Sequence, residues 1–256
     1  METNPLILSL IVGAFVGLAS GYLGSLMVLR KMALVGDALT HVALPGLAIG
    51  LLFGFNPFFG AFGALLLAIV LIWLIENHTK LSTETLVGIF FATSLSIGLL
   101  ITPEPELLEA LFGDISKTVL SEAIMASILS IMAIIAVHKI YNSLVLGTMS
   151  NDLASSVGIR TKRINFIFLL IVALIVALGI KIVGSLLMGS LVIIPAAAAK
   201  NLSRNLTAYA GLSALFGLAS AIGGIYLSSL LNFSSGPIVV LSSAAIFFIS
   251  LIFKKS

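Results

Sequence analysis

Two side chains that bind divalent metals stand four residues apart inside an apolar run. Asp37 and His41 follow the cations Arg30 and Lys31. On a helix the two side chains share a face, about 6 Å apart along the axis. An ionisable group at membrane depth costs several kcal/mol unless it faces protein or water. Because carboxylate and imidazole both bind Zn²⁺, Mn²⁺ and Fe²⁺, the pair predicts a stepping site for a cation that crosses a membrane.

A helix breaker follows this pair directly. Pro45 has no N–H, so on a helix it frees the carbonyl four residues back, which belongs to His41. Together with Gly46 it predicts a kink close to the metal-binding pair. The alternative interpretation is purely structural: Asp37 caps the inner end of the span and His41 is hydrogen-bonded in the core.

The composition is that of a membrane protein. Of 256 residues, 60% are hydrophobic and 9% are charged, against about 25% charged in soluble domains. Long continuous apolar runs favour helices over the alternating strands of a membrane barrel. The chain has no cysteine, which excludes thiolate metal sites, disulfides and cysteine nucleophiles. Its cations are scattered at the ends of apolar runs, which argues against a nucleic-acid partner.

The expected fold class is therefore all-α, a polytopic membrane helical bundle of eight to nine spans in a single domain, 1–256. Glycines at four-residue spacing predict close helix packing in two spans, at Gly13, Gly17 and Gly21 and at Gly46, Gly50 and Gly54. Two of the runs are short, so eight spans with one re-entrant segment is the alternative to nine. The apolar runs are 6–29, 38–54, 57–75, 86–102, 118–138, 164–180, 182–199, 206–231 and 236–253.

The distribution of Lys and Arg predicts the orientation, because cations are enriched on the cytoplasmic side. Nine spans with the N-terminus outside place eleven cations inside and only Lys117 and Lys181 outside. The C-terminus is then cytoplasmic. The outer loop 103–117 carries Glu104, Glu106, Glu109 and Asp114, which form either a solvated loop or an electronegative docking rim. The inner cations are Arg30, Lys31, Lys80, Lys139, Arg160, Lys162, Arg163, Lys200, Arg204, Lys254 and Lys255.

Two further segments contain residues that are typical of a docking helix and of a kinked helix. In the inner loop 139–163, Asn151 or Asp152 is expected to cap a short helix that runs through Val157 and stops at Gly158. Such a helix suits docking of a partner, and an ordinary interfacial loop is the alternative. In the run 183–200, Gly184 and Pro195 predict breaks or kinks of the kind that gate transporters.

Three stretches together resemble the permease subunit of metal-ion ABC importers, the family that handles zinc, manganese and iron. They are Gly36-Asp-Ala-Leu-Thr-His-Val-Ala-Leu-Pro-Gly46, Leu111-Phe-Gly-Asp114, and Val183-Gly-Ser-Leu-Leu through Ile194-Pro-Ala-Ala-Ala-Ala199. Their order and spacing match the family over nearly the whole chain. Thr40 stands where many members have serine, and Val42-Ala43 also varies, but neither change touches a candidate ligand.

The resemblance implies a homodimeric pore in the cytoplasmic membrane, two cytoplasmic ATPase subunits and an extracytoplasmic metal-binding protein. It assigns Asp37 and His41 to the metal pathway, with metal as substrate and no permanent cofactor. It also implies that the segment of about 149–160 is the coupling helix to the ATPase. The coupling residues would be Asn151, Asp152, Ala154, Ser155 and Gly158.

The expected function is translocation of Zn²⁺, Mn²⁺ or Fe²⁺ by an importer that takes its energy from a separate subunit. The chain itself lacks Gly-x-x-x-x-Gly-Lys-[Ser/Thr], the loop that cradles nucleotide phosphates, and is not expected to be an enzyme. One alternative is an ATP-independent cation carrier or channel that uses the same Asp37/His41 chemistry. Another is a permease for a larger chelate or vitamin, which the mostly Phe aromatic content disfavours.

Overall fold

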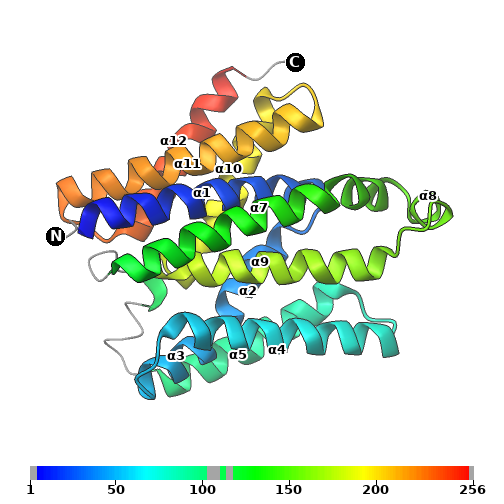
Figure 1. The fold of residues 1–256 in the computed structure, drawn as a ribbon, viewed down its shortest axis with the longest axis horizontal. Coiled ribbons are helices and arrows are strands. Elements are labelled where there is room, and N and C mark those ends of the chain that lie inside the picture. The colour runs from blue at the N-terminus through cyan, green and yellow to red at the C-terminus, as the bar shows by residue number, and fades with distance from the viewer. Residues whose placement is uncertain (1–4, 103–109, 114–117, 254–256) are drawn as a thin grey trace.

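In the computed structural model the chain is a bundle of α-helices (Figure 1). The structure describes residues 5–102, 110–113 and 118–253, and these contain no β-strand. The predicted all-α membrane bundle is confirmed. The helices are α1 (Pro5–Leu29), α2 (Ala33–Val42), α3 (Leu44–Leu52), α4 (Pro57–His78), α5 (Thr83–Ile101), α7 (Leu120–Met149), α8 (Asn151–Ser156), α9 (Thr161–Val183), α10 (Ser185–Leu202), α11 (Leu206–Leu231) and α12 (Ser235–Ile252).

Each apolar run of the sequence corresponds to a helix or a helix pair. Within the described ranges, eight segments are long and apolar enough to cross a membrane, and α2 with α3 counts as one of them, Ala33–Leu52. A further helix, α10, has the shorter apolar stretch Leu187–Leu202. Both short runs seen in the sequence, 38–54 and 182–199, are therefore helical.

One boundary differs strongly from the sequence expectation. The run 118–138 was expected to end its span at His138, but α7 continues to Met149 and has 30 residues. At 1.5 Å per residue such a helix is about 45 Å long, and the hydrocarbon core is only about 30 Å thick. The polar residues Tyr141, Asn142 and Ser143 do not interrupt it, and neither does Gly147. The extra turns carry α8 away from the body of the bundle (Figure 1).

The connections fall into two groups at opposite ends of the bundle. The α4–α5 connection, α8, the α10–α11 connection and the C-terminus lie at one end, and the N-terminus and the α3–α4 connection lie at the other (Figure 1). The α4–α5, α8–α9 and α10–α11 connections carry Lys80, Arg160 and Arg204, respectively. The cations of the sequence therefore gather at the end from which α8 projects.

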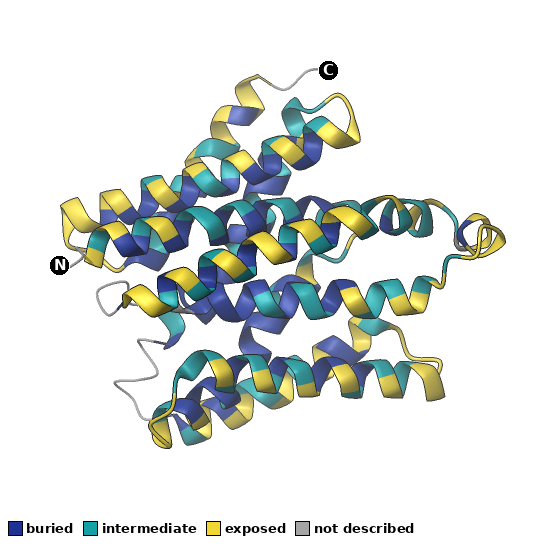
Figure 2. Cartoon of the chain, viewed as in Figure 1, coloured by how far each residue is buried: buried dark blue, intermediate teal, exposed yellow. Residues whose placement is uncertain are grey.

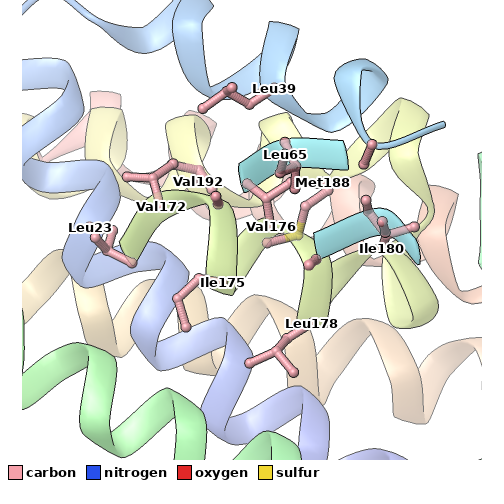
Figure 3. Close-up of a cluster of buried hydrophobic side chains, with 14 of the residues drawn as sticks. Leu23, Leu39, Leu65, Val172, Ile175, Val176, Leu178, Ile180, Met188 and Val192 are labelled. Atoms are coloured by element: carbon pink, nitrogen blue, oxygen red, sulfur yellow. The ribbon is translucent and has the colours of Figure 1, made fainter. Parts of the chain in front are cut away.

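Helix α9 joins the two sides of the bundle. Helices α3, α4 and α5 form one side, α1, α7, α11 and α12 the other, and α9 lies between them (Figure 1). Its side chains Val172, Ile175 and Val176 are buried in one cluster with residues of α1, α2, α4 and α10 (Figure 3). Exposed residues instead follow the outer faces of the peripheral helices (Figure 2).

Glycines let the helix backbones touch, as the four-residue spacing predicted for most of them. Gly17 packs on Gly217 of α11, with the Gly217 carbonyl 2.6 Å from where a Cβ would stand. The Ser213 hydroxyl donates a 2.6 Å hydrogen bond to the Gly21 carbonyl. Gly46 similarly contacts the Gly60 carbonyl of α4. Gly54 is different: it has φ +71° and no neighbour at its Cβ position, so it serves a turn.

We predict that Gly24→Ala destabilises the bundle, because a Cβ there would collide with the Val192 carbonyl of α10. The expected loss is about 1–3 kcal/mol, with about 2–4 °C of melting temperature per kcal/mol for a chain of this size. Thermal unfolding in detergent micelles measures it. The control Gly211→Ala has no neighbour within 4 Å and should unfold at an equal or higher temperature. Equal melting of Gly24→Ala and wild type would contradict this packing.

Candidate functional site

The helix that carries Asp37 and His41 is interrupted just beyond them. Asp37 and His41 lie on α2, which ends at Val42, and α3 begins at Leu44 with Pro45 in its first turn. The linking residue Ala43 has φ −71° and ψ −22°, so the chain stays near helical geometry. Since Pro45 has no N–H, the His41 carbonyl lacks the amide that would follow it in a continuous helix. At the end of α2 the Ala43 amide is instead directed at the carbonyls of His41 and Leu39.

The imidazole of His41 is buried and only partly satisfied. The residue is 8% exposed, and its Nδ1 is buried with no hydrogen-bond partner in the described part of the chain. The ring packs edge-on against Phe91 of α5, with centroids 5.2 Å apart. A buried polar atom without a partner costs about 1–3 kcal/mol. A metal ion or a proton donor at Nδ1 would remove that cost.

The carboxylate of Asp37 lies against a glycine of another helix. A Cβ on Gly189 of α10 would collide with Asp37 Oδ1 and stand 2.7 Å from the Asp37 Cα. The neighbouring Gly36 faces Met27 of α1 and Val192 of α10. Asp37 itself is half-buried, and its carbonyl accepts a 2.7 Å hydrogen bond from the Thr40 hydroxyl. The contact between α2 and α10 at Asp37 therefore requires glycine at position 189.

Gly189 is a site residue that the sequence analysis missed. Only Gly184 and Pro195 were singled out in that run. The available signal was a glycine in the middle of an apolar helix, where it costs about 1 kcal/mol relative to alanine unless packing needs it. Which residue it would face could not be read from the sequence.

The face of α2 that carries the pair leads from the surface into the interior. Leu34 is 81% exposed, Asp37 is half-buried and His41 is almost fully buried. Across the described residues, no three of His, Cys, Asp and Glu come together as a possible metal cluster. One chain therefore offers two side-chain ligands at this place, and a four-coordinate metal would take the others from water or another molecule.

The second and third family motifs meet at the end of the bundle opposite α8. Gly184, with φ +83°, separates α9 from α10, and the carbonyl of Leu111 lies against it. The Phe112 carbonyl is 2.6 Å from the Cβ position of Gly236, at the start of α12. Asp114, the last residue of the second motif, lies outside the described residues. Pro195 lies inside α10, which is helical on both sides of it.

The N-cap of the short helix α8 lies one residue before Asn151, the first of its two expected N-caps. Ser150, rather than Asn151 or Asp152, is the N-cap, and its hydroxyl accepts from the Leu153 amide at 3.3 Å. Gly158 has φ +78°, and its amide donates to the Ser155 carbonyl at 3.0 Å; the helix ends at Ser156, one residue before the expected Val157.

Three apolar side chains are exposed in and directly beside α8, at the end of α7, within α8 and at its C-cap. Met149, Leu153 and Val157 are 77%, 59% and 65% exposed. Asp152, Ser155 and Gly158 are exposed as well, whereas Ala154 is fully buried and packs inward. Exposed apolar side chains close together on a projecting segment are typical of a surface that another protein covers.

Comparison with known proteins agrees with these features. Residues 3–254 match the ABC 3 transport family. The chain is 37% identical over 253 residues to the high-affinity zinc uptake system membrane protein ZnuB of Haemophilus influenzae, covering 96% of each chain. It is 31% identical over 257 residues to the manganese transport system membrane protein MntC of Listeria monocytogenes, covering 99% of this chain and 92% of the relative.

A solved structure has the same fold. PsaBC from Streptococcus pneumoniae, in complex with Fab, superposes with a TM-score of 0.86 at 26% identity, over 98% of this chain and 92% of that one. The resemblance carried by the three motifs is thereby confirmed. The interrupted α2–α3 span, the Asp37/His41 pair within it and the projecting α8 all belong to a membrane permease, and the chain is a member of the ABC 3 transport family.

Proposed function

We propose that this chain is the permease subunit of an ABC importer that moves Zn²⁺, Mn²⁺ or Fe²⁺ along a path through Asp37 and His41. The observation that carries the metal path is the buried His41 Nδ1 without a partner, one helical turn from the Asp37 carboxylate. The zinc and manganese systems named for its relatives support the substrate class. The metal is cargo, and no permanent cofactor is needed.

Two copies of the chain form the pore, each supplying one carboxylate and one imidazole. Four oxygen and nitrogen ligands suit these divalent ions and disfavour Cu(I). Helix α5 supports this arrangement, because it packs beside α2 and exposes the small residues Gly88, Ala92 and Ser96 at four-residue spacing. In a bilayer such a face suits a second helix or a water-filled route better than lipid. The ligand site is then transient, since tight binding would prevent release.

Two ATPase subunits dock at the end where α8 projects, and this end faces the cytoplasm. The clustering of cationic connections there supports that orientation. The C-terminus is then cytoplasmic, and the membrane is the cytoplasmic membrane. The docking segment is about 149–160, with Asp152, Ser155 and Gly158 at its surface and Asn151 at its first turn. Ala154 contributes by packing α8 against the neighbouring ends of α7 and α9, because it is fully buried.

An extracytoplasmic binding protein delivers the metal at the opposite end. The contacts of Gly184 and Gly236 with Leu111 and Phe112 tie the outer loop to α9, α10 and α12. A protein that presses on this loop can therefore move the ends of those helices. The acidic residues of the loop lie outside the described residues, and their role as a docking rim is part of the proposal.

The alternative is an ATP-independent carrier or channel with the same ligand pair. It would leave the exposed apolar side chains at α8 unexplained, since such a protein needs no cytoplasmic ATPase subunit. Purification of the chain with an ATP-hydrolysing partner, or without one, separates the two functions.

Replacing either ligand should abolish transport while leaving the fold intact. For Asp37→Ala and His41→Ala we expect metal uptake to fall at least about tenfold, since each removes one of two protein ligands per chain and second-shell losses alone reach about 10–100-fold. The measurement is ATP-driven uptake of Zn²⁺ or Mn²⁺ into proteoliposomes with the assembled complex. The controls His78→Ala and Glu84→Ala, which flank the α4–α5 connection at the ends of α4 and α5, should transport normally. Normal uptake by both ligand variants would exclude this pathway.

A larger residue at Gly189 of α10 should displace the Asp37 carboxylate and so reduce transport. Gly189→Ala places a methyl group against Asp37, and overpacking of this kind costs about 1–3 kcal/mol. We expect a folded protein with uptake reduced several-fold, because the carboxylate must move. Gly63→Ala, which meets nothing within 4 Å, is the matched control. Uptake by Gly189→Ala equal to that of the control would show that the Asp37 position is unimportant.

A polar replacement on α8 should weaken binding of the ATPase subunit to this chain. Burying one leucine contributes about 1.5–3 kcal/mol, so Leu153→Ser should lower affinity for the ATPase subunit by about tenfold or more. Co-purification and titration in detergent measure the loss. Leu81→Ser changes the same residue type in the α4–α5 connection, where it is 45% exposed, and should bind normally. Equal affinity of the two variants would remove α8 from the docking surface.

A further inference from the structure

Arg30 makes contacts that link the α1–α2 turn to α9. Its Nη2 donates a hydrogen bond to Oδ1 of Asn165, and its guanidinium carbon lies 5.5 Å from the ring centre of Phe168. Phe168 is fully buried. The other terminal nitrogen, Nη1, is buried and has no partner among the described residues. A charged side chain at the inner boundary is thus held by one helix instead of pointing to water.

The turn that carries Arg30 is short and tightly bonded. Only Arg30–Met32 separate α1 from α2. Lys31 has φ +59°, the Met32 amide donates to the Met27 carbonyl at 2.8 Å, and the Lys31 amide donates to Val28 at 3.2 Å. This is the Schellman pattern, which closes a helix end without slack. A displacement of Arg30 is therefore passed to α2, where Asp37 is on the second turn.

The partners of Arg30 stand in the first turns of α9, directly after α8. The same turns hold α4, since Lys162 Nζ donates to Asn77 Oδ1 at 3.2 Å and the rings of Phe166 and Trp73 are 5.3 Å apart. The end of α7 touches them too, with Gly147 close to the methyl group of Thr161. The start of α9 is consequently the point where α8 meets both sides of the bundle.

We propose that Arg30, Asn165 and Phe168 form a latch that transmits movement of α8 to the helix bearing Asp37 and His41. This inference rests on the proposed function, because it assumes that α8 receives the motion of the ATPase. When α9 tilts, Asn165 pulls the guanidinium and the three-residue turn, and α2 shifts against α10 at Gly189. The latch residues are positioning residues and do not contact the metal.

The latch predicts a loss of coupling rather than a loss of ATP hydrolysis. In proteoliposomes containing the whole complex, Asn165→Ala and Arg30→Gln should hydrolyse ATP at near the wild-type rate. Metal imported per ATP should fall about fivefold or more, the usual size of an allosteric coupling. Asn165→Asp keeps an acceptor oxygen at the same place and should retain the wild-type ratio. Arg163→Gln, an exposed cation on the same helix, is the control and should also be normal.

The pair should also behave as one unit. The double variant Arg30→Gln/Asn165→Ala is expected to be no worse than the more severe single variant, because both remove the same interaction. If Arg30→Gln fails to fold, the comparison of Asn165→Ala with Asn165→Asp decides alone. A wild-type ratio in Asn165→Ala, or the same loss in Asn165→Asp, would overturn the latch. Wild-type protein that hydrolyses ATP without importing metal would instead refute the proposed function itself.

Discussion

The structure depends on the contact between α2 and α10 at Asp37 and Gly189. A carboxylate inside an apolar bundle is tolerated only where protein or water surrounds it. Here α10 approaches so closely that glycine is the one residue that leaves room. On the other side, Phe91 of α5 packs against His41. The polar pair is thus enclosed between two helices, and the face of α2 that carries it becomes exposed only toward Leu34.

Close backbone approach is the general means by which this bundle is held. In lipid the hydrophobic effect contributes little to the association of two helices. Small residues and short polar contacts therefore decide the packing. Gly17 and Gly217 join α1 to α11, and Gly46 joins α3 to α4. The same approach sets the direction of α2, whose Gly36 lies over Met27 and Val192. The position of the ligands follows from these glycines more than from the ligands' own chemistry.

The chain combines a packed interior with a projecting part. Helix α9 fills the centre and touches both sides, whereas α8 stands clear of the bundle on the long α7 (Figure 1). A displacement of α8 would reach the start of α9, where Asn165 contacts the α1–α2 turn and Lys162 and Phe166 both contact α4. A tightly packed interior transmits such a displacement because it has few voids in which to absorb it. This arrangement suits a permease whose energy comes from another subunit.

Much of this could be predicted from the sequence, because a bilayer restricts the possible structures. Apolar runs, glycine spacing and the placement of cations gave the helical class and the order of the spans, and the Asp37-x-x-x-His41 spacing gave one helical face. Pro45 located the interruption to within two residues. Local chemistry was sufficient for each, since every one depends on residues close together in the chain.

Contacts between distant helices were decided only by the tertiary structure. That Gly189 faces Asp37, that Arg30 reaches Asn165, and that Leu111 lies on Gly184 each depend on how helices cross, for which a single sequence has no local signal. The length of α7 was missed because polar residues can continue a helix beyond the membrane, and the cap at Ser150 followed from that extension. Sequence therefore determined which residues can bind a metal, and packing decided which of their atoms stay unpaired and what holds them.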